Sequence, residues 1–178
     1  MLPVASALLV TVSFPPFNVN IAAWFSLAPL LFALRQRGTL SAGGLAFLFG
    51  CLFGLGAFYW ANNIEPVNLA NFLIMLIFFS LYFLIFGLLY RLISMGIGSW
   101  NILGAPALWV AIEYVRSNLS FLACPWNLVG QSQYGCLPVI QIADFTGVYG
   151  ISFLIVMVNQ LLSQVPDLFA ARGGGRIQ

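Results

Sequence analysis

The chain alternates between long apolar runs and short polar breaks. A transmembrane helix needs about 20 apolar residues to cross a hydrocarbon core of roughly 30 Å, and six runs approach or reach that length. The pattern therefore predicts an all-α fold, a polytopic transmembrane helix bundle of about six helices. The predicted helices lie near residues 1–13, 21–34, 42–61, 68–93, 102–116 and 147–165. Together they form one multi-pass domain over residues 1–171, with a flexible tail over 172–178.

Several of these helices carry features that modify the prediction. The first run rises only about 20 Å at roughly 1.5 Å per residue, so either it enters the membrane halfway or its beginning precedes Met1. Pro29 predicts a kink in the second helix. Pro106 is expected in the first turn of the fifth helix, where a missing N–H costs least, and Pro166 is expected to end the sixth. The Gly50-x-x-x-Gly54 spacing in the third helix predicts close packing against another helix.

Composition supports membrane insertion. Of 178 residues, 62% are hydrophobic and only 6% are charged, and the mean hydropathy is +1.02. A soluble domain carries roughly a quarter charged residues, so ten charges cannot cover a water-facing surface. The net charge of +2 comes without a basic cluster, which excludes nucleic acid as a partner. No basic segment precedes the apolar start, which argues against a cleaved secretory signal.

The arginines give the bundle a direction. If the runs alternate across the bilayer, five arginines fall on one side and only Arg116 falls on the other. The positive-inside rule makes the five-arginine side cytoplasmic, so we expect a cytoplasmic N-terminus. The outer side then holds a loop of about thirty residues, 117–146, and long loops of this kind are often functional. The five cytoplasmic arginines are Arg35, Arg37, Arg91, Arg172 and Arg176.

Candidate chemistry is sparse. The sequence has no His and no Lys, and it contains neither a GxSxG nor a P-loop motif. No metal site and no cofactor are predicted, and no catalytic residue is assigned. Cys51 reads as a packing residue, whereas Cys124 and Cys136 flank one loop. Free thiols are favoured for that pair, and a disulfide stays open as the alternative.

Two constellations lie at the predicted outer face. Glu113 and Arg116 share a face of the fifth helix with Trp109, which fits either a salt bridge that fixes the helix end or a polar wall for a lipid headgroup. The segment from Cys124 to Tyr134 is polar and aromatic, which fits either anchoring at the membrane interface or a substrate rim. Further on, Asp144 or Thr146 is expected to cap the sixth helix.

These residues carry a family resemblance. Over nearly its whole length the chain resembles the membrane domain of bacterial apolipoprotein N-acyltransferase, in order and in spacing. The departure is Cys124, where the family usually has Phe before Pro-Trp. The matching stretches are Ser13–Asn18, Trp24–Leu31, Gly50–Trp60, Pro106–Arg116, Pro125–Gln133, Gln141–Asp144 and Gly147–Phe153.

The resemblance implies an activity and a location. Family members move an acyl chain from a membrane phospholipid to the N-terminal cysteine of a lipoprotein, at the outer face of the bacterial inner membrane. Their chemistry lies in a nitrilase-like domain with a Glu-Lys-Cys triad between the seventh and eighth helices. The chain stops after the sixth matching helix and contains no lysine. We therefore expect a truncated or split membrane portion that is inactive alone.

The resemblance also names a site and partners. The residues expected to line a portal for phospholipid or lipoprotein are Glu113, Arg116, Trp126, Asn127, Gln131 and Gln133. A separate nitrilase-like domain is a further expected partner. The alternatives are a non-enzymatic membrane scaffold, a small transporter subunit or an independent lipid-handling module. A transporter usually has broken helices with charges near the midplane, whereas the charges here sit at predicted helix ends.

Overall fold

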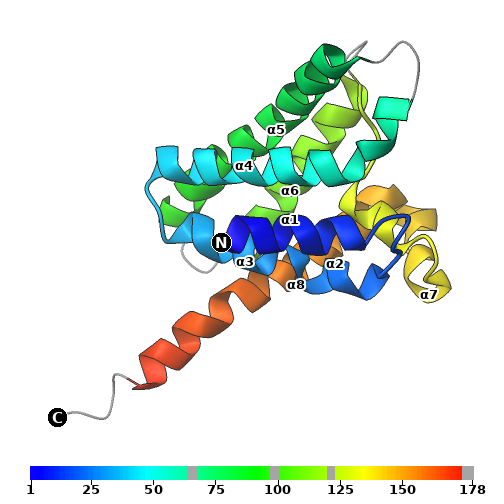
Figure 1. Ribbon diagram of the computed structural model, residues 1–178. Helices are drawn as coiled ribbons and strands as arrows, with labels where there is room; N and C mark the ends of the chain where they lie inside the picture. The colour runs from blue at the N-terminus through cyan, green and yellow to red at the C-terminus, as the bar shows by residue number, and fades with distance from the viewer. Residues whose placement is uncertain (64–67, 97–100, 120–122, 174–178) are drawn as a thin grey trace.

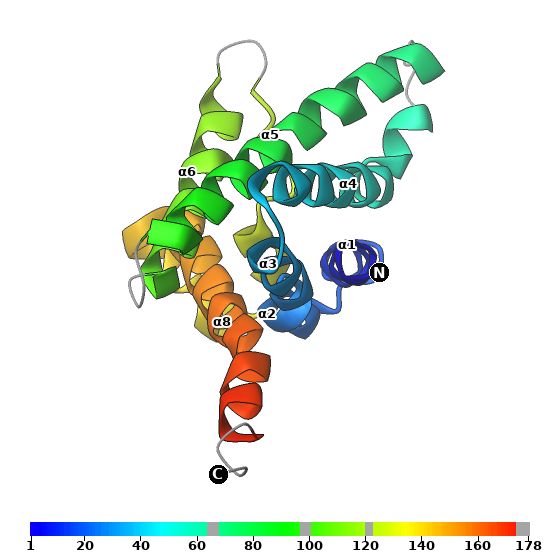
Figure 2. The same cartoon turned by 90° about the vertical axis from the view of Figure 1, so that its left-hand side faces the viewer.

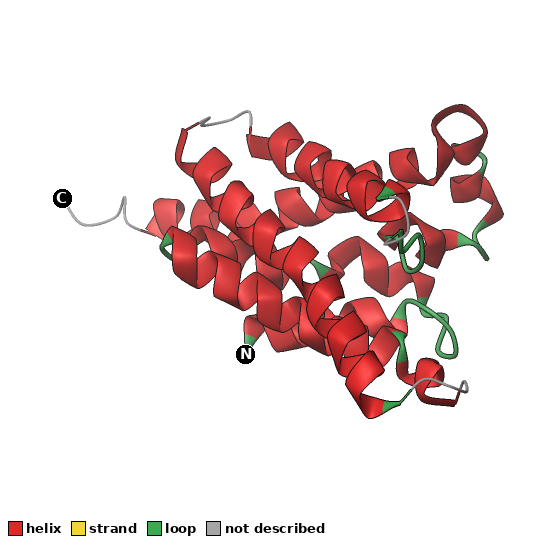
Figure 3. Cartoon of the chain, turned by 90° about the horizontal axis from the view of Figure 1, so that it is seen from above, coloured by secondary structure: helices red, strands yellow, loops and turns green. Residues whose placement is uncertain are grey.

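The computed structural model describes residues 1–63, 68–96, 101–119 and 123–173 (Figure 1). Helices account for almost all of the described chain, which contains no strand (Figure 3). The predicted all-α fold is thus confirmed. The α-helices are α1 (Leu2–Val12), α2 (Ala23–Ser26), α3 (Ala28–Arg35), α4 (Thr39–Ala57), α5 (Leu69–Gly96), α6 (Asn101–Asn118), α7 (Leu137–Ile140) and α8 (Ala143–Gly173). The 3-10 helices that matter below are η1 (Asn20–Ala22), η2 (Tyr59–Asn63) and η5 (Val129–Gln133).

Three helices within the described residues are long and apolar enough to cross a membrane. They are α4, α5 and the Ala143–Phe169 part of α8. Two shorter apolar helical stretches, Leu2–Val12 and Asn20–Arg35, accompany them. Every one of the six predicted runs contains helix, although its ends differ from those predicted.

A buried asparagine explains the break in the second predicted run. The run divides at Leu27 into α2 and α3, and Pro29 lies in the first turn of α3. Asn159 of α8 fills the break: its Oδ1 accepts from the backbone N–H groups of Leu27 at 2.7 Å and Ala28 at 2.9 Å. Its Nδ2 donates to the Ala23 carbonyl at 2.9 Å. One side chain therefore satisfies the backbone groups that the kink frees.

Helices α4 and α5 make the most extensive contact among the described helices, and Figure 2 shows α5 crossing α4. A Cβ atom added at Gly50 would lie 2.9 Å from the Ser80 Cα of α5, closer than real side chains approach. The predicted glycine packing is confirmed. An aromatic core lies behind this contact, and the Trp109 ring of α6 packs edge-on to Phe86 at 5.0 Å between centroids.

Both proline predictions at helix ends are wrong. Helix α6 begins at Asn101, so Pro106 lies inside it rather than in its first turn. Helix α8 continues through Pro166 to Gly173. Arg35 of α3 supports this continuation, because its Nη2 donates to the Ser163 carbonyl before the proline and pairs with the Asp167 carboxylate after it.

Candidate functional site

The loop after α6 folds back onto the end of that helix. The Cys124 N–H donates to the Arg116 carbonyl at 2.8 Å, which satisfies a C-terminal acceptor of α6. Asn127 then takes a left-handed conformation at φ 56°, which asparagine tolerates better than most residues. This turn directs the chain into η5. Part of the predicted long outer loop is therefore regular structure, comprising η5 and α7.

Arg116 binds the backbone of this loop. The side chain is 2% exposed, and its Nη1 donates to the carbonyls of Cys124 at 3.0 Å and Trp126 at 2.7 Å. The guanidinium also lies over the Phe79 ring, 4.9 Å from its centroid, in a cation–π contact. The charge of Arg116 is thus directed at loop backbone and an aromatic face.

Glu113 holds the loop at a second point. Its Oε1 accepts from Trp109 Nε1 at 2.9 Å and from the Val129 N–H at 2.8 Å. Its Oε2 is buried without a hydrogen-bond partner among the described residues. A cavity of about 10 Å³ lies beside the carboxylate, which is about the minimum space for one water molecule. Glu113 forms no ion pair with Arg116 in the described structure, so the predicted salt bridge is absent.

Two glutamines fix the rest of the segment. Gln131 closes the turn, because its Oε1 accepts from the Leu128 N–H and its Nε2 donates to the Pro125 carbonyl, both at 3.0 Å. Gln133 is 1% exposed and reaches the N-terminal helices. Its Oε1 accepts from Trp24 Nε1 at 3.1 Å, and its Nε2 donates to the Asn20 carbonyl at 2.9 Å.

An open cavity of about 530 Å³ adjoins the segment from Trp126 to Tyr134. We name it the outer bowl. Trp126 forms one wall with its side chain 54% exposed, and its ring packs on Trp60 at 5.5 Å between centroids. The bowl is lined by Phe14, Pro15, Trp60, Trp126, Asn127, Gln131 and Tyr134.

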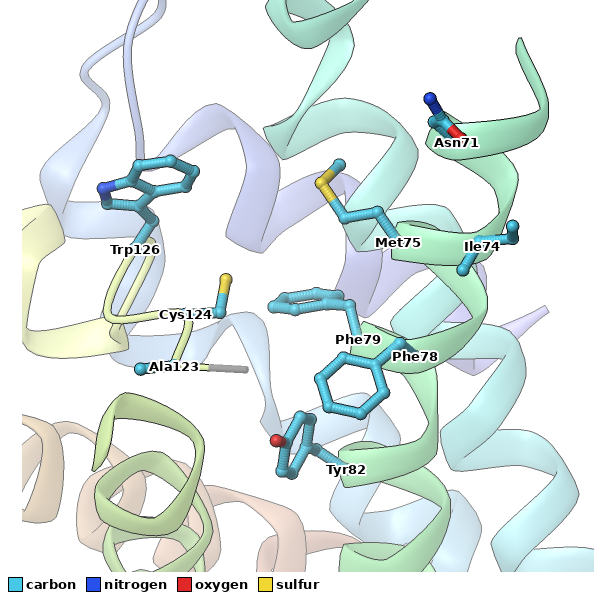
Figure 4. Close-up of a pocket in the computed structure, with 9 residues that line it drawn as sticks. All are labelled: Asn71, Ile74, Met75, Phe78, Phe79, Tyr82, Ala123, Cys124 and Trp126. Atoms are coloured by element: carbon cyan, nitrogen blue, oxygen red, sulfur yellow. The ribbon is translucent and has the colours of Figure 1, made fainter. Parts of the chain in front are cut away.

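A second cavity, of about 400 Å³, also has Trp126 in its lining (Figure 4). We name it the α5 pocket, because most of its wall is one face of α5. Its lining is almost entirely apolar, and Trp126 belongs to both cavities. The α5 pocket is lined by Asn71, Ile74, Met75, Phe78, Phe79, Tyr82, Ala123, Cys124 and Trp126.

The structure divides the six predicted portal residues into two groups. Trp126, Asn127 and Gln131 line the outer bowl, whereas Glu113, Arg116 and Gln133 are buried beneath it. Their role in lipid binding stays a prediction. The sequence reasoning missed the bowl residues Trp60 and Tyr134 and the pocket residue Tyr82. Trp60 had a signal, since it ends one of the stretches that carry the family resemblance, but nothing in the local pattern of Tyr82 indicates a pocket.

Two smaller predictions are also decided here. The cysteines at 51, 124 and 136 are all free thiols, so the favoured alternative is confirmed. Capping of the last helix by Asp144 or Thr146 is wrong, because α8 begins at Ala143 and both residues lie inside it. The Thr146 hydroxyl donates backwards to the Ile142 carbonyl at 3.0 Å. Gly147 makes the bend instead, with φ 63° and ψ −173°, a conformation suited to glycine.

Known proteins match this chain along most of its length. The family model described as the apolipoprotein N-acyltransferase N-terminal domain matches residues 6–161. An apolipoprotein N-acyltransferase of Geobacter metallireducens is 34% identical, over 97% of this chain. The proteins of that name from Thermotoga maritima and Photobacterium profundum are 30% and 28% identical, over 90% and 91% of the chain. The chain spans about a third of the length of each of these relatives: 34%, 34% and 33%.

Proposed function

Because the chain belongs to the apolipoprotein N-acyltransferase family, we propose that its 178 residues act as the membrane domain of such an enzyme. In this role the outer bowl receives the lipid substrates, a phospholipid acyl donor and a lipoprotein acceptor. It presents them to a catalytic domain of the nitrilase type. Trp126, Asn127 and Gln131 are the contact residues.

One observation carries the proposal: the exposed Trp126 indole lines both a bowl with polar groups and an apolar pocket. Trp side chains favour the membrane–water boundary, because one edge is apolar and the other donates a hydrogen bond. A lipid substrate has a polar part and apolar chains, so it would contact both environments at Trp126. The buried contacts of Glu113, Arg116 and Gln133 hold the segment from Trp126 to Gln133 in place. A preformed site loses less conformational entropy when a ligand binds.

We assign the acyl-transfer chemistry to residues outside this sequence. The Glu-Lys-Cys triad that the resemblance implies requires a lysine, and these 178 residues contain none. Within the described chain, the bowl offers amide, phenol and indole groups that bind polar atoms. We therefore expect the domain to bind lipid but to transfer no acyl chain by itself.

The proposed location is the bacterial inner membrane, with the bowl outside and the N-terminus in the cytoplasm. Arg35 and Arg91 lie near the C-terminal ends of α3 and α5, and these helix ends lie at the opposite end of the bundle from α7 (Figure 1). The positive-inside rule places that end in the cytoplasm. A lipoprotein acceptor would then reach the bowl from the outer side.

The test uses the purified chain in lipid nanodiscs and a fluorescent diacylated lipopeptide. Substituting Trp126→Ala should weaken lipopeptide binding about tenfold, as expected for an anchor worth about 1.4 kcal/mol. Phe169→Ala is the matched control, because it removes another exposed aromatic side chain, 69% exposed, from the far part of α8. Equal affinity of wild type and W126A would refute the assignment of the bowl. Acyl transfer by the chain alone would refute the assignment of catalysis elsewhere.

A further inference from the structure

The lining of the α5 pocket includes a buried polar group without a partner. Tyr82 is only 6% exposed, and its hydroxyl is buried without a hydrogen bond to any of the described residues. In Figure 4 the ring extends from α5 across the base of the pocket, with the oxygen toward the Ala123–Cys124 side. A buried hydroxyl without a partner is costly, and such groups in native structures call for an explanation such as a ligand.

The surroundings of this hydroxyl define what it can bind. Cys124 lines the same pocket, and Arg116, in the last turn of α6, interacts electrostatically with Tyr82. Arg116 already donates to two loop carbonyls. Among the described lining residues, the Tyr82 hydroxyl is therefore a buried donor that is free to bind a neutral oxygen acceptor.

The rest of the pocket selects an apolar ligand. Ile74, Met75, Phe78 and Phe79 form a continuous wall along α5 (Figure 4). From Asn71 to Tyr82 this helix rises about 16 Å, at roughly 1.5 Å per residue. The volume of about 400 Å³ lies within the range of ligand sites, about 300–1,000 Å³. A long apolar chain with one oxygen acceptor fits this lining.

We propose that the α5 pocket binds an acyl chain of an ester lipid, and that the Tyr82 hydroxyl donates a hydrogen bond to the ester carbonyl. The polar part of the same molecule lies across Trp126 in the outer bowl. This inference rests on the proposed function and deepens it, because it names Tyr82 as the residue that distinguishes an ester from other apolar chains. Both a glycerophospholipid and a diacylglyceryl lipopeptide supply that ester.

The experiment compares ester and ether lipids that are otherwise identical. Diacyl and dialkyl phosphatidylethanolamines of equal chain length compete with a labelled diacyl lipid for the chain in detergent. Wild type should prefer the diester about five- to tenfold, the range expected of one hydrogen bond. Tyr82→Phe should bind both lipids alike and should unfold at the same temperature or higher, because it removes an unpaired buried hydroxyl.

The matched control is Tyr114→Phe, which removes the hydroxyl of a tyrosine that is 57% exposed on α6. This variant should keep the ester preference. Equal binding of diester and diether by wild type would overturn the inference, and so would an ester preference that persists in Y82F. A diacylated lipopeptide as a third competitor identifies the source of the ester: whichever diester competes at lower concentration is the occupant.

Failure of the inference can be separated from failure of the proposed function. Tyr134 lines the bowl but not the α5 pocket, so Tyr134→Ala separates the two. If the bowl assignment is wrong, Y134A leaves the binding of the lipopeptide unchanged. If only the role of Tyr82 is wrong, Y134A still weakens that binding while wild type shows no ester preference.

Discussion

Glu113 and Arg116 lie one turn apart on α6, yet each is bonded to the loop that follows rather than to the other. Glu113 accepts from the Val129 N–H at 2.8 Å, and Arg116 donates to the Trp126 carbonyl at 2.7 Å. An acidic and a basic side chain thus hold the two ends of a four-residue segment. This arrangement positions Trp126 and Asn127 at the bowl. Substitutions at the buried residues Glu113 and Arg116 should therefore change the position of these two bowl residues.

Removing the carboxylate should loosen the start of η5. Glu113→Ala leaves the Trp109 indole N–H and the Val129 N–H without their acceptor, at a cost of about 1–3 kcal/mol for each buried donor. We expect a loss of about 2–6 kcal/mol in unfolding free energy and faster hydrogen exchange at the Val129 amide. Glu113→Gln keeps one carbonyl acceptor and should recover part of the loss. Unchanged exchange in E113A would show that Glu113 does not hold the loop.

Replacing the guanidinium should have a different effect. Arg116→Lys keeps the positive charge but loses the planar donor geometry and the stacking on Phe79. A charge-assisted hydrogen bond contributes about 1.5–3 kcal/mol, so we expect a loss of about 2 kcal/mol and faster proteolysis at the loop. Arg37→Lys, at an exposed position, should change neither quantity. Identical proteolysis of R116K and wild type would count against the clamp.

Glycine at position 50 should be required by the α4–α5 contact. Gly50→Ala would place a methyl group 2.8 Å from Phe83 Cδ2 and 2.9 Å from the Ser80 Cα. Overpacking of this kind costs about 1–3 kcal/mol. Gly44→Ala meets nothing within 4 Å on the same helix and should be neutral or gain up to about 1 kcal/mol. The measurement is thermal unfolding of both variants in detergent. Equal melting temperatures would contradict the requirement for glycine at position 50.

The proposed orientation of the chain in the membrane can be tested by labelling introduced cysteines. In a chain whose three native cysteines are replaced by alanine, we introduce Leu40→Cys at the arginine end and Leu137→Cys in α7. Both positions are exposed, at 86% and 68%. An impermeant maleimide should label L137C in intact spheroplasts but label L40C only after permeabilisation. The reverse pattern would invert the proposed topology.

The sequence is informative about helices and less so about their ends. Apolar periodicity, glycine spacing and Pro29 predict the bundle, the α4–α5 contact and the kink at Leu27. The continuation of α8 past Pro166 could not be predicted, because it depends on Arg35 binding on both sides of that proline from a distant helix. Tertiary contacts of this kind override local propensity.

Some residues of the site could likewise be predicted from the sequence, and others could not. Interfacial chemistry singled out Trp126, Asn127 and Gln131, since aromatic and amide side chains beside an apolar helix suit a lipid boundary. The burial of Glu113 and Gln133 depends on partners 16 residues or more away, so the spacing of residues could not reveal it. Tyr82 lies within a continuous apolar run, and its missing partner is visible only in three dimensions.

The most direct test of the lipid-presenting role is photocrosslinking mapped by mass spectrometry. A diacylated lipopeptide with a photoreactive group beside its N-terminal cysteine is irradiated with the chain in phospholipid nanodiscs. Adducts are expected within residues 126–134, and both W126A and an excess of unlabelled lipopeptide should reduce them. Adducts confined to the arginine end, or an adduct pattern that neither treatment changes, would contradict it.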